Sequence, residues 1–145
     1  MESLFGGAGD WGLLALRVAL GIIFIYHGYS KLLKVPPIGG PGGLAKGLQT
    51  LGFPVPLFLA WVVALVEVPG AAALILGLFT RWVSLIIAIE MAVVIFRVKR
   101  GRGVAFTARD TTGWEFDFIN LAAALALMLL GAGSISLDAA FGLRF

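Results

Sequence analysis

Four long apolar stretches dominate the pattern of hydrophobic and polar positions along the chain. They cover residues 11–33, 56–79, 82–98 and 114–131. A helix that crosses a bilayer needs about 20 mostly apolar residues, with a range of roughly 17–25, and each stretch is close to that length. Trp11, Trp82 and Trp114 each lie at the start of one stretch, where tryptophan favours the membrane interface. The pattern predicts an all-α polytopic membrane protein, an antiparallel bundle of four transmembrane helices.

The connections between the four stretches differ in length and composition. The first, residues 34–55, is rich in Pro and Gly, and residues 43–51 within it can form a short interfacial helix. Only Thr80 and Arg81 join the second and third stretches, which predicts a tight antiparallel pair. A basic polar loop follows over residues 97–113. No repeat of 20–50 residues is visible, so we expect a single membrane domain over residues 1–145.

Composition agrees with a membrane protein and excludes several kinds of chemistry. Hydrophobic residues make up 60% of the 145 residues, and the mean hydropathy is +1.01. A soluble domain is about 45–50% apolar. The chain has no cysteine and one histidine, which excludes thiolate chemistry and bis-histidine haem ligation within one chain. No group of residues has the spacing of a metal site, so we predict no metal and no intrinsic cofactor.

The positive charges predict the orientation of the chain. Eight Lys and Arg residues flank or lie in the two long connections, whereas only Arg81 and Arg144 lie at the other end outside the spans. Basic loops stay in the cytoplasm, so we expect both termini to be extracytoplasmic in the inner membrane. The same rule explains the net charge of +3 better than binding to nucleic acid does, and we expect no nucleic-acid partner.

Ionisable residues inside the apolar stretches are the most informative feature. A charge at bilayer depth costs at least about 2.5–3.5 kcal/mol, so it must be paired, protonated or hydrated. Helical spacing and depth predict two groups. The deep group contains Arg17, Glu67 and Glu90, and the inner polar cluster contains His27, Lys31, Glu115, Asp117 and Asn120.

The deep group predicts a ligand pocket, since two glutamates face one arginine. A protonated glutamate could donate a hydrogen bond to a ligand while Arg17 holds the other carboxylate. His27 is expected beside this site, and Phe24 and Trp61 are candidates for an apolar wall. The catalytic residues, if the protein is an enzyme, cannot be assigned, because no complete catalytic set is present.

Structural explanations compete with each of these assignments. A buried Arg17 pair can simply lock helices in register, and Lys31 can extend to the interface. Glu115 and Asp117 at the start of a helix favour the helix dipole, and His27 can be a hydrogen-bonded packing residue. Glu90 is harder to explain in this way, because one arginine cannot neutralise two glutamates.

Several short strings, in this order and spacing, resemble the DoxX family of membrane proteins. They are Arg17 with Gly21, His27-Gly28 and Lys31; Glu67-Val68-Pro69-Gly70, Leu76-Gly77 and Thr80-Arg81; and Gly113-Trp114-Glu115, Gly131 and Ser136-Leu137-Asp138. Pro69 and Ala132 depart from the expected Gly and Pro. The resemblance implies a four-helix membrane bundle and an association with redox systems: a subunit of a thiosulfate:quinone oxidoreductase, and a membrane partner of superoxide dismutase and a sulfurtransferase.

Three functions are compatible with these observations. The first is a membrane subunit of a redox complex that interacts with quinone and docks a soluble enzyme. The second is a non-enzymatic membrane scaffold with structural ion pairs. The third is a small-solute transporter or lipid-binding bundle. The expected partners are the lipid bilayer, a soluble redox enzyme and further copies of the chain as a homo-oligomer.

Overall fold

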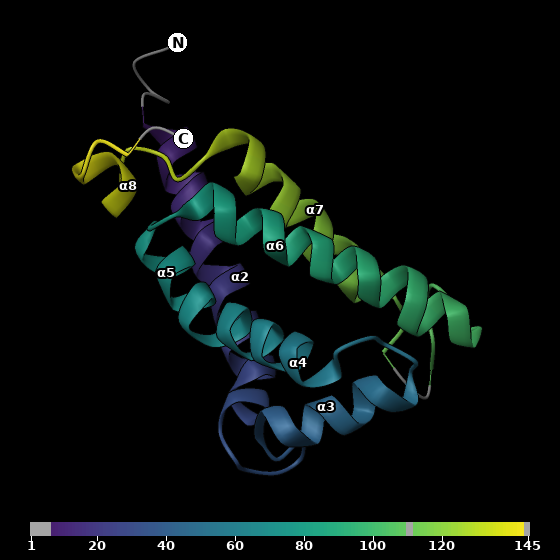
Figure 1. Cartoon of the computed structure of the whole chain (residues 1–145). Coiled ribbons are helices and arrows are strands. Elements are labelled where there is room, and N and C mark those ends of the chain that lie inside the picture. The colour runs from purple at the N-terminus through teal and green to yellow at the C-terminus, as the bar shows by residue number, and fades with distance from the viewer. Residues whose placement is uncertain (1–6, 110–111, 144–145) are drawn as a thin grey trace.

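The computed structural model describes residues 7–109 and 112–143, and every regular element in these residues is a helix (Figure 1). The elements are α2 (Ala8–Leu32), α3 (Gly40–Thr50), α4 (Pro56–Leu65), η1 (Val66–Gly70), α5 (Ala71–Leu76), α6 (Thr80–Val93), η2 (Val94–Lys99), η3 (Arg100–Arg102), α7 (Glu115–Leu130) and α8 (Leu137–Ala140). The prediction of an all-α protein is therefore confirmed for this part of the chain.

Two helical stretches are long and apolar enough to cross a membrane. Ala8–Leu32 has 25 residues, and Pro56–Leu76, which runs through α4, η1 and α5, has 21. The helix α6 has 14 residues and continues as η2 for 6 more, while α7 has 16. That α6 and α7 also cross the membrane therefore stays a prediction.

The second stretch shows how single residues shape a long helix. Pro69 has no N–H to donate to the preceding turn, and the backbone widens there into the π-helical turn η1. The helix ends at Leu76, not at position 79 as the sequence suggested, because Gly77 adopts a left-handed φ of +69°. The tight connection to α6 therefore consists of residues 77–79, and Thr80 and Arg81 already belong to α6.

The helices meet around a small apolar core. Leu20 and Phe24 of α2 pack there with Leu74 of α5, Ile87 of α6 and Leu127 of α7. Glycines on α2 allow the close approach that the sequence predicted: a Cβ at Gly21 would collide with the side chain of Ile75, and one at Gly28 would collide with that of Glu67. Glu67 is thereby placed opposite Gly28.

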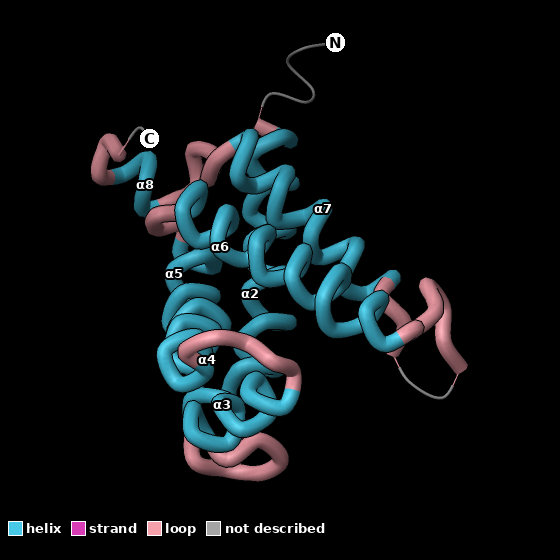
Figure 2. Tube along the Cα trace, turned by 45° about the vertical axis from the view of Figure 1, so that its right-hand side comes forward, coloured by secondary structure: helices cyan, strands magenta, loops and turns pink. Residues whose placement is uncertain are grey.

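The two ends of the molecule carry different parts of the chain. Figures 1 and 2 show the start of α2 and α8 at one end, the terminal end, and α3 with the connection after α6 toward the other. The helices α6 and α7 run side by side in both views, and α3 lies against α4. α3 begins at Gly40, three residues before the expected start of the interfacial helix, with proline in its first turn.

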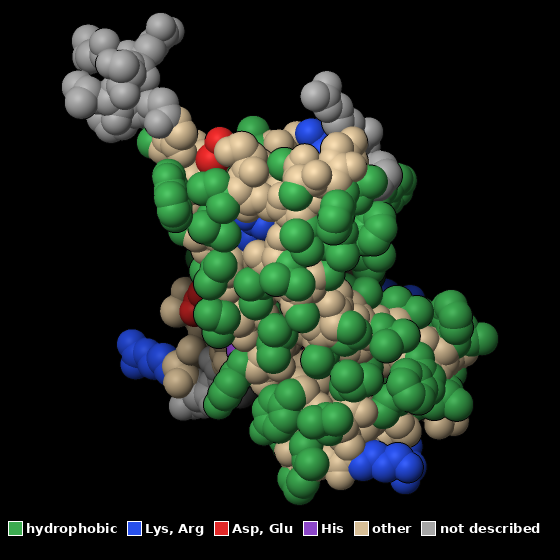
Figure 3. Space-filling view, turned by 90° about the vertical axis from the view of Figure 1, so that its left-hand side faces the viewer, with side chains coloured by type: hydrophobic (Ala, Val, Ile, Leu, Met, Phe, Trp, Pro, Cys, Tyr) green, Lys and Arg blue, Asp and Glu red, His purple; other side chains and the backbone are tan. Residues whose placement is uncertain are grey.

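The outward faces are strongly apolar. Hydrophobic side chains cover most of the middle of the face shown in Figure 3. Trp11 and Trp82, near the terminal end, are 65% and 53% exposed. Large exposed apolar surfaces of this extent need a non-aqueous neighbour, which a bilayer provides.

Candidate functional site

A cavity of about 140 Å³ lies where α2, η1, α6, η2 and α7 meet. Seven of the residues that the sequence singled out line it: Phe24, His27, Lys31, Glu67, Glu90, Asp117 and Asn120. The two groups predicted from depth are thus not separate layers, because members of both contribute to one cavity. Whether a ligand binds there stays a prediction.

The cavity contains an ion pair between two helices. Nζ of Lys31 on α2 donates to Oε1 of Glu67 on η1 over 2.5 Å. The Glu67 side chain is only 3% exposed and that of Lys31 is 22% exposed. The expectation that Lys31 extends to the interface is wrong, because Gly28 lets η1 approach α2 so closely that a carboxylate lies within reach of the ammonium group.

The second carboxylate oxygen of Glu67 is the unusual atom of the site. Oε2 of Glu67 is buried and receives no hydrogen bond from any described group. The Glu90 carboxyl group on α6 lines the same cavity and interacts with the Glu67 side chain, and Lys31 is the nearby cation. One ammonium group cannot neutralise two carboxylates, so the site accommodates one more proton or hydrogen-bond donor. The sequence argument for Glu90 predicted this imbalance, although with a different cation.

His27 and Phe116 lie at the rim of the cavity, between α2 and α7. Their rings lie 5.5 Å apart, and the His27 side chain is exposed. Nδ1 of His27 is 2.8 Å from the carbonyl oxygen of Ile23, a geometry that assigns the Nδ1–H tautomer and leaves Nε2 as an acceptor. His27 is therefore held by its own helix and borders the cavity as well.

Asp117 connects the cavity to the basic connection after α6. Oδ2 of Asp117 is 2.5 Å from Nζ of Lys99, which also donates to the carbonyl oxygen of Gly113. Asn120, one turn later on α7, donates to the carbonyl oxygen of Phe116. Glu115 lies in the first turn of α7 but does not line the cavity. Two members of the inner polar cluster therefore have separate partners: Lys31 pairs with Glu67, and Asp117 pairs with Lys99.

Arg17 does not belong to this site, so its predicted contact with Glu67 and Glu90 is wrong. Arg17 and Gly28 are eleven residues apart on α2, which is about 16 Å of helix rise and beyond the reach of a guanidinium. Arg17 is fully buried toward the terminal end, where it donates to the carbonyl oxygens of Ile75 and Ile135 and lies near Asp138. The depth estimate failed because it aligned the spans without knowing where η1 packs.

The predicted aromatic wall is only half correct. Phe24 is buried and lines the cavity, whereas Trp61 on α4 is 46% exposed and lies outside it. Sequence reasoning missed Lys99, which was assigned to topology alone, and Phe116. Phe116 and Asn120 are four residues apart and therefore share a helix face, a signal that was available in the sequence.

Helices of membrane length, an apolar outer surface and a charged cavity at their meeting point define an all-α membrane protein. The chain belongs to the DoxX family, which it matches over residues 12–100. The resemblance found in the short strings is thereby confirmed.

Three relatives match most of the chain. It is 33% identical to "Putative oxidoreductase CatD" of Bacillus subtilis (strain 168), over 88% of this chain and 84% of the relative. It is 31% identical to "Inner membrane protein YphA" of Escherichia coli (strain K12), over 92% and 93%. It is 33% identical to an uncharacterized protein of Haemophilus influenzae (strain ATCC 51907 / DSM 11121 / KW20 / Rd), over 89% and 90%. No solved structure matches the chain.

Proposed function

We propose that this protein is a four-span inner-membrane subunit of a redox system, and that its cavity holds the ring of a quinone. The observation that carries the proposal is that the buried Oε2 of Glu67 accepts no hydrogen bond, in a cavity between the helices that Glu90 also lines. The name of the Bacillus subtilis relative, which includes the word oxidoreductase, supports the redox part.

The size and lining of the cavity fit such a ring. Its volume of about 140 Å³ is close to the roughly 150 Å³ of an apolar cavity known to admit benzene. Phe24 and Phe116 supply apolar surface, and Glu67 and Glu90 supply oxygen atoms that can share a proton with a carbonyl group. His27 at the rim is exposed and Phe116 is half-buried, and we infer that the tail of a lipid-soluble quinone leaves the cavity between them into the bilayer.

A bound quinone would accept two electrons and two protons. The electrons would come from the soluble enzyme that we propose docks on this subunit. The Glu67–Glu90 pair would hold one proton at Oε2 of Glu67. Lys31 would balance the charge that remains when this proton leaves. His27 at the rim, with Nε2 free to accept, would pass protons to the pair.

The orientation proposed from the sequence is supported by the arrangement of the chain. The start of α2 and α8 lie at one end and the basic connections toward the other (Figure 1). Arg144, one of the two basic residues expected outside, lies beyond the described residues. Because the chain has no cysteine, single cysteines introduced at positions 46 and 105 can be labelled unambiguously from either side. Labelling of both from outside the cell alone would refute cytoplasmic basic connections.

Binding of a short-tailed quinone analogue to the purified protein tests the proposed ligand. We expect Glu90→Gln to weaken binding about tenfold, because the amide cannot share a proton with Glu67. Asp10→Asn is the matched control, since Asp10 hydrogen-bonds Ser134 at the opposite end of α2. Native mass spectrometry of protein extracted with its lipids would show whether a quinone accompanies it. Equal affinities for wild type and both variants would refute the proposal.

The two alternative functions give different results in the same experiments. A scaffold requires a closed core in which every charge is paired, and it would bind no analogue. A transporter requires a water-filled path between both ends, and its solute would compete with the analogue. The Oε2 of Glu67, which accepts no hydrogen bond beside a cavity, favours a bound ligand over a fully paired core. A homo-oligomer is compatible with each function, and its mass would appear in the same spectra.

A further inference from the structure

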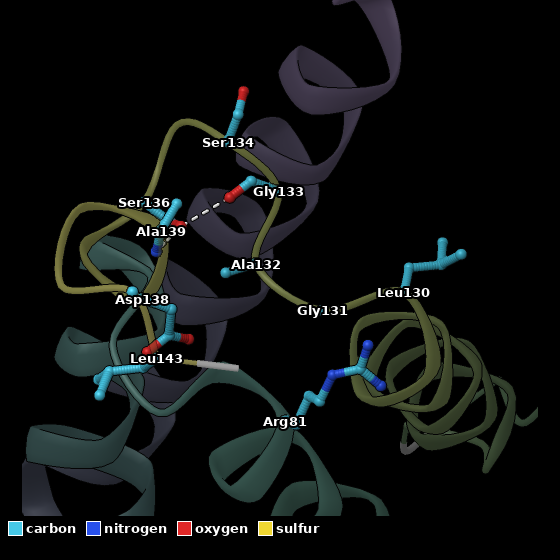
Figure 4. Close-up of a pocket in the computed structure, with 11 residues that line it drawn as sticks. Arg81, Leu130, Gly131, Ala132, Gly133, Ser134, Ser136, Asp138, Ala139 and Leu143 are labelled. Carbon is cyan, nitrogen blue, oxygen red and sulfur yellow. Dashed lines mark hydrogen bonds between the residues drawn. The ribbon is translucent and has the colours of Figure 1, made fainter. Parts of the chain in front are cut away.

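A second, larger cavity lies at the terminal end of the molecule, away from the proposed quinone site. Its volume is about 390 Å³, and Figure 4 shows that Arg81 of α6 borders it on one side and the segment with Ser136, Asp138 and Ala139 on the other. Residues 130–134 at the end of α7 complete the lining. Pockets for small ligands typically measure about 300–1,000 Å³.

Arg81 uses only part of its guanidinium for structure. Nη1 donates to the carbonyl oxygens of Met128 and Leu129 at 3.0 and 2.9 Å, which satisfies the last turn of α7. Nε and Nη2 donate to no described group. These two nitrogens form the edge of the guanidinium that binds oxyanions through two parallel hydrogen bonds.

The backbone leaves this edge uncovered. Gly131, with φ of +84°, lies directly beside it, and a Cβ at this position would be 3.3 Å from Nε and 3.4 Å from Nη2. Any other residue would place its side chain over the two donors. A glycine at this point therefore keeps the Nε–Nη2 edge accessible to the cavity.

The nearby carboxylates do not neutralise Arg81. Both oxygens of Asp138 accept backbone hydrogen bonds, from Phe79 and Thr80, and both oxygens of Asp10 bind Ser134. Asp138 also lies near the buried Arg17. Within residues 7–109 and 112–143, Arg81 has no carboxylate within ion-pair distance. Among the described residues, therefore, no carboxylate compensates the charge of Arg81 in the cavity.

Two exposed tryptophans place this cavity near the membrane surface. Trp82 directly follows Arg81, and Trp11 lies at the same end of α2. Tryptophan side chains favour the depth of the lipid headgroups. Arg81 would therefore meet both lipid phosphates and ions from the aqueous phase.

We propose that the terminal cavity binds a phosphate-like oxyanion and that the Nε–Nη2 edge of Arg81 recognises it. The ligand is either the phosphate of a membrane lipid headgroup or a free inorganic oxyanion. The larger volume of the cavity leaves room for a glycerol group beside the phosphate. This inference is independent of the proposed quinone site, because the two cavities share no residue.

Two probes distinguish the sources of the oxyanion. Full-length protein in a neutral detergent is titrated with inorganic phosphate at constant ionic strength and, separately, with dihexanoyl phosphatidic acid below its micelle concentration. Binding is measured by native mass spectrometry and by tryptophan fluorescence during thermal unfolding. Binding of the short lipid alone supports a headgroup site, and binding of inorganic phosphate supports a free oxyanion. If neither probe binds the wild type, the proposal is wrong.

Two pairs of variants test the assigned residues. Arg81→Lys keeps the charge but cannot form two parallel hydrogen bonds, and we expect affinity to fall about tenfold. Because Arg81 also supports α7, a second variant leaves it unchanged: Ala139→Leu fills the cavity and should weaken binding more than tenfold. Ala140→Leu is its matched control, an exposed neighbour outside the lining, with binding as in wild type. Unchanged binding in Ala139→Leu would overturn the proposal.

Discussion

Two basic residues of α2, Arg17 and Lys31, make opposite kinds of contact. At the terminal end, Arg17 is fully buried, and its guanidinium donates to two backbone carbonyl oxygens near Asp138. About 21 Å further along the helix, Lys31 pairs with Glu67, whose second oxygen stays without a donor beside a cavity. The hydrogen bonds of Arg17 join three segments of the chain, whereas Oε2 of Glu67 accepts no hydrogen bond.

The difference teaches that burial of a charge does not by itself indicate function. Arg17 connects α2 to the end of α5 and to the segment before α8, which explains its burial by packing alone. Glu67 is about equally inaccessible, and each side chain has one buried atom without a hydrogen-bond partner, Nε of Arg17 and Oε2 of Glu67, but only Glu67 lines a cavity. A buried group that lacks a partner is costly, so its persistence favours a ligand or a mobile proton at that place.

The largest loss of stability is expected from a substitution of Arg17. Arg17→Ala should lower the free energy of unfolding by about 3–5 kcal/mol, because it removes a buried cation and leaves Asp138 and the Ile135 carbonyl group without it. Equilibrium unfolding in mixed micelles measures this. Arg102→Ala, an exposed substitution, is the control. A loss no larger than that of the control would mean that Arg17 does not hold the terminal segments together.

A smaller effect is expected where α2 and η1 touch. Gly28→Ala should cost about 1–3 kcal/mol, because the new methyl group would collide with the Glu67 side chain and push η1 away. Gly12→Ala on the same helix meets no atom within 4 Å. The control should therefore be neutral or slightly stabilising, by up to about 1 kcal/mol from helix propensity. Equal unfolding free energies for the two variants would contradict the close approach at Gly28.

Lys31 and Glu67 should show a measurable coupling energy. Lys31→Met leaves the Glu67 carboxylate buried without its cation, whereas the addition of Glu67→Gln removes that charge. We expect a coupling energy of roughly 1–2 kcal/mol in the double-mutant cycle, reduced by the partial exposure of Lys31. Unfolding in detergent of the four proteins measures it, with Lys34→Met as a control for loss of a neighbouring lysine. Strict additivity would show that the ion pair contributes nothing.

The sequence predicted elements better than it predicted contacts between them. Apolar length and Gly28 were sufficient for the helices and for their close approach, since these depend on composition and local sterics. The pairing of Arg17 depends on where α4, η1 and α5 pack along α2, and on the end of α5 before Gly77. Helical periodicity determines neither. The sequence did not predict the pair of Lys99 with Asp117, because a basic residue in that loop is already explained by the orientation of the chain in the membrane.

The smallest effect, a coupling near zero between Arg17 and Glu67, is the sharpest test of the comparison. From the sequence alone these residues were expected to form one pair, and removing both charges was expected to cost less than removing Arg17 alone. In the structure Glu67 is bonded to Lys31, and Arg17 is bonded to carbonyl groups at the other end of α2. Sites that share no partner and lie more than about 7–10 Å apart add within about 0.5 kcal/mol. Arg17→Ala, Glu67→Gln and the double variant, unfolded beside the Lys31 cycle as a positive control, measure the difference. A coupling as large as that of Lys31 with Glu67 would mean that one charge network runs the length of α2, and the proposed quinone site would then have to include Arg17.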